Sequence, residues 1–415
     1  KISKCPVATH VNNQEEHGSM LFTLRKHWKK SLFAACSITY AFHYGSQRFR
    51  EYLTRRKYFF AAQNYGEAFI SPLDKPRRLY VVLNPAASNR KAKKLFQTNA
   101  APLFYLAGID VTYIQTDYEG HAKTIVNYFD PTIDGIVVVG GNGTIQEVVT
   151  GIMRQDEKNP VINIPVGIVP TGEQSNALFK RLFGSDVINV KAICESAMAI
   201  IQGQSSLFDV VEVKTDQKSV FALNSIHVGL HQQVKERLDD GKYWILGPLK
   251  RYFACGWKTI KNWPPIENGI SVTCNKCSPL SSATPQEQPN SHLSKAACYT
   301  DKKLTQKESV GSNKITTCGL SVWLTELDQR SSFTVQYNAD EVSKTEFIQH
   351  GAQWIKNKYK HTPADHLKTV ICDELSITLN KGQELSYDID GEIYDGRPIH
   401  VSVYPRKLHM FVPKK

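Results

Sequence analysis

Apolar and polar residues alternate in blocks between residues 75 and 205. Short apolar runs typical of buried strands are followed by stretches in which apolar residues recur every three or four positions, as in helices. Four runs are predicted as strands: 79–83, 111–114, 136–139 and 166–170. Because strands that alternate with helices form a parallel sheet covered on both faces, we expect an α/β domain over residues 75–205.

Beyond residue 205 the apolar residues alternate at period two, which is typical of strands with one buried face. Such runs are predicted as strands at 208–213, 219–223, 270–273, 320–324, 333–337, 375–379 and 399–403. Residues 275–314 are rich in Ser, Pro, Gln, Lys and Asn, so we expect a disordered insertion there. A second, all-β domain is therefore expected over residues 206–411, in a chain of 415 residues that is long for a single core.

The N-terminal residues show neither pattern. Residues 1–19 are polar, so we expect them to be disordered or an untranslated leader. Residues 20–60 flank the apolar, aromatic-rich run 32–44 with basic residues, and this run is shorter than the ~20 residues that span a bilayer. The composition predicts an amphipathic segment for mitochondrial targeting or for anchoring on an anionic membrane surface. A solvated basic helix packed on the following domain is the alternative.

The net charge of +12 indicates an anionic partner, such as phosphate, acidic lipid or nucleic acid. Between Leu21 and Phe60 the chain has nine Lys or Arg residues and one Glu, so +8 of the net charge lies in the N-terminal segment. This location favours a membrane surface, and we expect no nucleic-acid partner. The nine Cys residues have no framework spacing and are expected to be reduced thiols, because no second pair completes a zinc site with Cys274 and Cys277.

The loop Gly140-Gly141-Asn142-Gly143-Thr144 joins the third strand to a helix. Its glycines allow close approach of a ligand, and the first N–H groups of the helix are free to bind a phosphate. A tight turn without a ligand is the alternative, and Thr144 can cap the helix, donate to a phosphate, or do both.

Three more polar loops follow the other strands, and the carboxyl ends of parallel strands meet at one edge of the sheet. They begin at Asn84-Pro85, at Thr116 and at Thr171-Gly172, the last including Asn176. Each also fits a plain turn. Near the C-terminus, Asp390-Gly391-Glu392 fits a hairpin turn, and on the residues alone this is the better interpretation. The functional interpretation is a general base or a Mg²⁺ ligand for phosphoryl transfer.

Together these motifs resemble the diacylglycerol kinase catalytic family, which includes sphingosine kinases and bacterial lipid kinases, and within it the mitochondrial acylglycerol kinase branch. The matching residues are Asn84-Pro85, Thr116, Gly120-His121-Ala122, Gly140, Gly141, Gly143, Thr144, Glu147 to Gly151, Pro170, Gly172, Asn176, Gly247-Pro248, Asp390-Gly391-Glu392 and Pro405 to Leu408. The resemblance covers about Met20 to Phe411 and is specific as a set.

The resemblance implies an α/β nucleotide domain and a C-terminal β-sandwich that carries the lipid site. It implies transfer of phosphate from ATP, with Mg²⁺, to monoacylglycerol or diacylglycerol at the mitochondrial inner membrane, facing the intermembrane space. The implied roles are nucleotide binding for Asn84, Thr116, Gly140, Gly141, Asn142, Gly143, Thr144, Glu147, Gly172 and Asn176, base and metal binding for Asp390 and Glu392, and lipid headgroup binding for Asp209.

Two positions depart from the family pattern. Asn142 replaces the signature aspartate, and a neutral amide binds Mg²⁺ more weakly than a carboxylate and cannot act as a base. Glu173-Gln174 replaces the usual threonine of the fourth loop. We expect an active enzyme that depends on its C-terminal carboxylates. The competing class is a weakly active or inactive subunit of the inner-membrane carrier translocase. A soluble NAD kinase shares a similar glycine loop, but the basic aromatic segment and Gly247-Pro248 argue against it.

Overall fold

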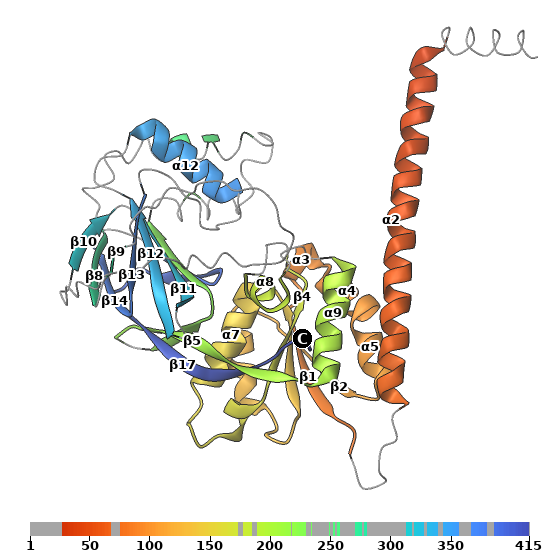
Figure 1. The fold of residues 1–415 in the computed structure, drawn as a ribbon, viewed down its shortest axis with the longest axis horizontal. Helices are drawn as coiled ribbons and strands as arrows, with labels where there is room; N and C mark the ends of the chain where they lie inside the picture. Colours follow the sequence, from red (N-terminus) through yellow and green to blue (C-terminus); the bar gives the residue numbers. More distant parts are fainter. Residues whose placement is uncertain are drawn as a thin grey trace, which may run out of the picture. The chain divides into compact units, whose positions relative to one another are not determined.

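The computed structural model, shown in Figure 1, describes residues 27–67, 75–172, 177–184, 189–216, 218–229, 234, 249, 252–253, 255–257, 270–275, 278–279, 313–317, 319–327, 330–338, 343–356, 367–379 and 386–414. The chain divides into two compact units, residues 1–57 and 58–415. The predictions for residues 1–26, for Asn176 and for Gly247-Pro248 lie outside the described residues.

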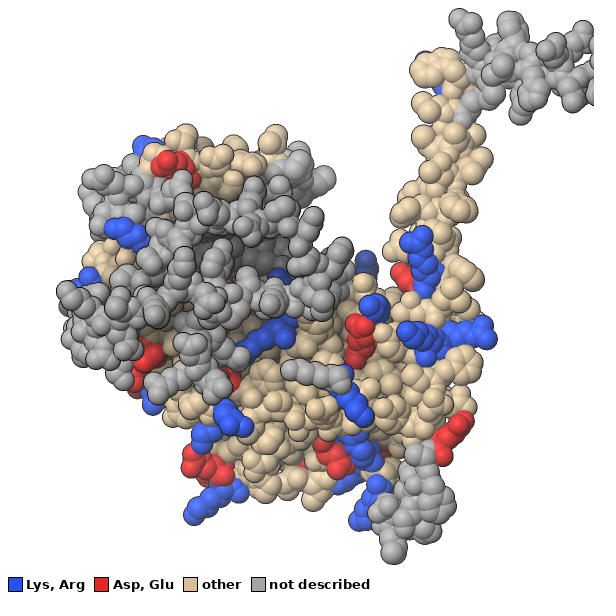
Figure 2. All heavy atoms as spheres, in the orientation of Figure 1, with Lys and Arg blue, Asp and Glu red and all other residues tan. Residues whose placement is uncertain are grey.

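Helix α2 runs from Trp28 to Gly66 and includes the expected apolar run within one continuous helix. Over residues 28–57 most of its aromatic side chains are exposed, and Figure 2 shows Lys and Arg side chains on its surface. No helix among the described residues is long and apolar enough to cross a membrane. The last turns of α2 belong to the second unit, in which Ala62 is fully buried and the Tyr58 hydroxyl donates to Glu195 over 3.2 Å.

The four predicted α/β strands are all present. They are β1 (Arg78–Leu83), β2 (Asp110–Gln115), β3 (Gly135–Gly140) and β4 (Val166–Pro170). They pair in parallel in the order β4-β3-β1-β2. Every residue of β3 and β4 is buried, as expected of central strands with helices on both faces.

Helices cover both faces of this sheet, as Figure 1 shows. On one face Ile136 and Val138 pack with Ile145 and Val148 of a helix, whereas Val137 and its neighbours pack on the other face with Phe96 and Phe104. The helices are α3 (Ala87–Arg90), α4 (Ala92–Asn99), α5 (Ala101–Leu106), α6 (His121–Ile125), α7 (Asn142–Met153), α8 (Ala177–Phe183) and α9 (Val190–Gln202), with 3-10 turns η1 (Val126–Tyr128) and η2 (Pro160–Asn163).

The first sheet continues beyond β4 into the C-terminal region through antiparallel pairing. Its additional strands are β5 (Ser205–Lys214), β6 (Ser219–Ala222), β8 (Ile270–Asn275), β10 (Asn313–Thr317), β14 (Glu374–Leu379) and β17 (Ile399–Phe411). Strand β17 pairs with β14 and β5, and its Met410 pairs in parallel with Val166 of β4. The last strand therefore belongs to both cores.

A second, antiparallel sheet completes the C-terminal region. It consists of β7 (Ser225–Gly229), β9 (Ser278–Pro279), β11 (Gly319–Leu327), β12 (Arg330–Asn338), β13 (Leu367–Cys372), β15 (Ser386–Ile389) and β16 (Glu392–Asp395). Its Phe333 and Val335 share one apolar core with Ile377 and Val401 of the first sheet. The expected α/β plus all-β architecture, with a sandwich at the C-terminal end, is confirmed.

Several elements were not predicted from the pattern. They are β7, β13 and helix α12 (Lys344–Lys356). The hairpin turn expected at Asp390-Gly391 is confirmed, because β15 and β16 pair antiparallel on either side of it. The ends of the expected insertion are strand residues, because Asn313 pairs with Cys274 in the β8–β10 ladder and Ser278 lies in β9. Most of residues 275–314 lies outside the described residues.

Candidate nucleotide site

The glycine loop turns β3 into α7 in very little space. Gly140 ends the strand, and a Cβ there would lie 2.7 Å from the Thr144 hydroxyl oxygen. Gly172, at the start of the fourth loop, packs so closely on Gly141 that a Cβ at Gly172 would lie 3.0 Å from the Gly141 Cα. The first N–H groups of α7 have no partner within the helix. The first N–H groups of α7 therefore follow a loop that packs too closely for a side chain at Gly140 or Gly172.

Asn84 ties the first loop to the glycine loop. Its Nδ2 donates to the Thr144 hydroxyl oxygen over 3.0 Å, and its Oδ1 accepts the N–H of Ala86 over 3.0 Å. Because the Thr144 oxygen accepts from Asn84, its own proton remains available for a ligand. Asn84 thus orients Thr144 as a donor.

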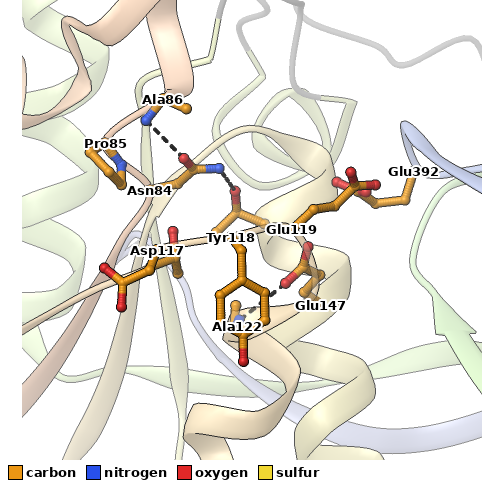
Figure 3. Close-up of a pocket in the computed structure, with 11 residues that line it drawn as sticks. Asn84, Pro85, Ala86, Asp117, Tyr118, Glu119, Ala122, Glu147 and Glu392 are labelled. Carbon is orange, nitrogen blue, oxygen red and sulfur yellow. Dashed lines mark hydrogen bonds between the residues drawn. The ribbon is translucent and has the colours of Figure 1, made fainter.

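A cavity of 230 Å³ brings three of the four predicted loops together with the C-terminal acidic turn (Figure 3). Its lining residues are Asn84, Pro85, Ala86, Thr116, Asp117, Tyr118, Glu119, Ala122, Thr144, Glu147 and Glu392. The expected convergence of loops at the carboxyl edge of the sheet is therefore seen for the first three. The fourth loop reaches this edge through the contact of Gly172 with Gly141.

Glu147 lines the cavity, but its carboxylate already binds the backbone. It accepts the N–H of Gly120 over 2.9 Å and the N–H of Ala122 over 3.1 Å, and the residue is buried. These two bonds hold the loop after β2 against α7. The geometry gives Glu147 a loop-holding role, and its part in nucleotide binding stays a prediction.

Glu392 reaches the glycine loop from the distant hairpin β15–β16. A Cβ at Gly143 would overlap the Glu392 carboxyl group, so glycine at this position makes room for the carboxylate. Burial, then the charges of Glu147 and Glu119, raise the pKa of Glu392 to about 7, opposed by the Lys123 ammonium. A carboxyl group with this pKa, in the wall of the cavity, suits proton transfer near neutral pH.

Asp390 lies two residues away but faces a different environment. Its carboxylate accepts backbone N–H groups of Leu223 at 2.5 Å, Asn224 at 3.1 Å and Ser225 at 2.8 Å. Burial raises the pKa of Asp390 to about 6, and the three backbone bonds oppose this shift. Asp390 is buried, adopts φ +52° and is not among the residues that line the cavity. The structure therefore separates two carboxylates that the sequence treats alike.

Asn142 and Asp209 also occupy distinct surroundings. The Asn142 Oδ1 atom is buried and has no hydrogen-bond partner among the described residues. Asp209 accepts the Arg406 N–H over 2.6 Å and the Ser331 hydroxyl proton, so it stabilises the bulge of β17. Asp209 does not line the cavity.

The sequence reasoning did not single out Tyr118, Glu119, Lys123 or Tyr394. Tyr118 and Glu119 line the cavity, and Lys123 donates to the Tyr394 hydroxyl over 3.1 Å. Tyr118 and Glu119 lie in the polar stretch after the second strand, so the position of that loop was a usable signal. Tyr394 offered no such signal, because its partner lies far away in the sequence.

Comparison with known proteins shows the family to which the chain is related. The diacylglycerol kinase catalytic domain matches residues 78–213, and the acylglycerol kinase C-terminal family matches residues 238–415. The mitochondrial acylglycerol kinase of Pongo abelii is 34% identical over 412 residues, covering 95% of this chain and 96% of its own. Its Homo sapiens counterpart is 33% identical with the same coverage.

A solved Bacillus anthracis protein, assigned as a diacylglycerol kinase, shares the fold with a TM-score of 0.52 and 18% identity, covering 82% of this chain and 98% of its own. The two family matches, together with relatives that align over 95% of the chain, identify the family. The chain belongs to the acylglycerol kinase family, lipid kinases built on the diacylglycerol kinase catalytic domain.

Proposed function

We propose that this protein transfers the γ-phosphate of ATP to monoacylglycerol and diacylglycerol, giving lysophosphatidic and phosphatidic acid. The observation that carries the proposal is the position of Glu392, whose carboxyl group lies against Gly143 at the start of α7. The cavity thereby combines the Thr144 hydroxyl, in the first turn of α7, with a carboxyl group that suits a substrate hydroxyl. The names of the full-length relatives support acylglycerols as the substrates.

In this proposal the glycines admit the phosphates and the Thr144 and Thr116 hydroxyls donate to their oxygens. The ionised Glu392 accepts the proton of the acylglycerol hydroxyl as that oxygen bonds to the γ-phosphorus and the bond to ADP breaks. Asp390 fixes the hairpin that carries Glu392, through its bonds to the backbone at Leu223 to Ser225.

The donor set fits one Mg²⁺ bound jointly with the phosphates. Glu119 and Glu392 line the cavity together, and the charge of Glu119 helps to raise the Glu392 pKa. A cation would relieve this repulsion. No group of three or more His, Cys, Asp or Glu among the described residues could hold a metal by itself. Since kinases bind Mg²⁺ through one or two carboxylates plus phosphate oxygens, such a set is sufficient. The ion would neutralise charge on the transferring phosphate.

The exposed aromatic and basic side chains of α2 support attachment to an anionic membrane surface. We place that membrane in the mitochondrion, because the relatives are named as mitochondrial proteins. The inner membrane, facing the intermembrane space, is the compartment proposed for it. A non-catalytic role as a translocase subunit is the competing function, and a kinase assay separates the two.

The test is phosphate transfer from labelled ATP to monoolein by the purified full chain. We expect product from the parent and a loss of about 100-fold or more in Glu392→Gln, since a general base contributes 10²–10⁴-fold. Asp395→Asn is the matched control, because it removes an exposed carboxylate from the same hairpin. Gly141→Glu should also abolish transfer. A parent without activity that gains it through Asn142→Asp would reject the active-kinase proposal.

A further inference from the structure

The cavity has one aromatic wall, formed by Tyr118. Its side chain is 64% exposed although it is a large aromatic residue, and Figure 3 shows it among the lining side chains. The ring stacks in parallel on the His121 imidazole, with centroids 4.6 Å apart and planes inclined by 8°. One face of Tyr118 is thus covered by His121, and the exposure of the side chain shows that the ring keeps open surface.

This aromatic pair is held in place before any ligand binds. The His121 Nδ1 accepts the N–H of Asp117 over 3.1 Å, which fixes the imidazole plane. The flanking N–H groups of Gly120 and Ala122 bind the buried Glu147. A surface that is ordered in advance costs little entropy when a flat ligand stacks on it.

We propose that Tyr118 is the platform on which the nucleobase of the bound nucleotide stacks. The inference rests on the proposed function, since it requires a nucleotide whose phosphates lie at the glycine loop. The cavity extends from Thr144 at that loop to Tyr118. Aromatic side chains bind nucleobases by stacking because every base has a planar π-face.

The surroundings of Tyr118 favour a base over an acyl chain. Its neighbours in the lining include Thr116, Asp117 and Glu119, all polar or charged. An acyl chain would leave these groups without hydrogen bonds, whereas a nucleobase carries its own donors and acceptors. The platform therefore sets affinity for the nucleoside part, and the glycine loop sets affinity for the phosphates.

Binding of ATP and of inorganic tripolyphosphate, each with Mg²⁺, to the full chain separates these contributions in calorimetric titrations. We expect Tyr118→Ala to weaken ATP binding about 5- to 150-fold, the equivalent of ~1–3 kcal/mol per stacked base. Tyr118→Phe, which keeps the ring, should stay within about threefold of the parent. Tripolyphosphate, which has no base, should bind all variants alike. Tyr128→Ala is the control, because Tyr128 is 86% exposed and does not line the cavity.

Equal ATP binding by the parent and Tyr118→Ala would overturn the platform and leave the proposed function intact. An equal loss of ATP and tripolyphosphate binding would also overturn it, since that pattern indicates a disturbed loop. A Tyr118→Ala variant that binds ATP normally but has a raised KM for monoolein would assign the ring to the lipid. A parent that binds no ATP would overturn the proposed function and the platform together.

Discussion

At the scale of single residues, the site depends on which carboxylate faces the glycine loop. Glu392 lies against Gly143, whereas Asp390 is bound by three backbone N–H groups of residues 223–225. The two side chains are close in sequence but lie in different surroundings. The Asp390 carboxylate accepts backbone hydrogen bonds, whereas the Glu392 carboxyl group lies near the like charges of Glu147 and Glu119. In the proposed mechanism, proton transfer therefore belongs to Glu392 and support of the hairpin to Asp390.

The raised pKa of Glu392 predicts a pH profile. A base must be ionised, so log kcat/KM for Mg·ATP, which reports the enzyme before the ion and nucleotide bind, should rise with a slope near one below pH about 7 and level off above it. Glu392→Gln should show a low rate without this limb. The measurement is initial rate against pH at fixed ionic strength. A parent profile that is flat from pH 5.5 to about 8 would assign the base elsewhere.

The same pKa predicts the opposite trend for stability. The folded-state pKa of about 7 lies above the ordinary value of 4.5, so between these pH values the folded protein holds a proton that the unfolded chain has released. This contribution to stability is present below pH 4.5 and is lost as pH rises through 7. At pH ~8, Glu392→Gln should thus be more stable than the parent, by on the order of 1–2 kcal/mol after allowance for partial exposure. Urea unfolding at two pH values measures this difference.

Gly143→Ala tests the contact between the loop and Glu392. Alanine favours a helix over glycine by about 1 kcal/mol, so the fold should be unharmed. Its Cβ, however, overlaps the end of the flexible Glu392 side chain, which must move away. Misplacement of a catalytic group by about 1 Å can cost ~100-fold in rate.

Steady-state kinetics and thermal melts of Gly143→Ala provide the readout. Gly45→Ala is the control, since it adds a methyl to a helical glycine with nothing within 4 Å. Full activity in Gly143→Ala would show that Glu392 does not act from this position.

At the scale of elements, one hydroxyl joins three segments of the site. Lys123 of α6 donates to the Tyr394 oxygen over 3.1 Å, and Tyr394 of β16 donates to Gln146 Oε1 of α7 over 3.1 Å. Gln146 is fully buried and continues the chain to Thr150, which bonds to the backbone of Phe221. The hairpin that carries Glu392 is therefore fastened to the helix that begins at the glycine loop.

Tyr394→Phe removes this junction while keeping the ring. The buried Gln146 oxygen loses its donor, which should cost ~1–3 kcal/mol of unfolding free energy. Because Glu392 lies two residues away on the same strand, kcat should fall more than ATP affinity does. Denaturant unfolding and kinetics measure the two effects, with Tyr128→Phe as the exposed control. An unchanged kcat alongside lowered stability would restrict Tyr394 to a structural role.

The elements also show which parts of the fold and the site can be predicted from the sequence. Strands β1, β3 and β4 were predictable because buried runs such as Ile136–Val139 have few alternatives, and the loops followed from the strand ends. The β15–β16 hairpin was visible only as a turn, because its place beside Gly143 depends on β15 pairing with β7. The distinction between Asp390 and Glu392 and the role of Tyr394 depend on these long-range contacts, which local patterns do not encode.

At the scale of the whole molecule, residues 1–57 and residues 58–415 form separate compact units. The second contains the cavity and both β-sheets, and it includes Ala62, which is buried against the α/β core. The first presents exposed aromatic and basic side chains over residues 28–57. Catalysis and membrane attachment should therefore be separable between Lys57 and Tyr58.

Deleting residues 1–57 should abolish binding to vesicles of phosphatidylcholine with phosphatidylserine, because each basic residue removed contributes ~1 kcal/mol of attraction to the anionic surface. Phosphorylation of detergent-dispersed monoolein should stay within about threefold of the full chain, because the deletion removes no residue that lines the cavity. A deletion that extends to residue 66 should instead unfold part of the α/β core, since it also removes buried Ala62. Sedimentation with vesicles, with and without the anionic lipid, measures attachment. Equal sedimentation of the 58–415 protein and the full chain would refute the membrane role of α2, and activity lost on dispersed substrate would show that the first unit takes part in catalysis.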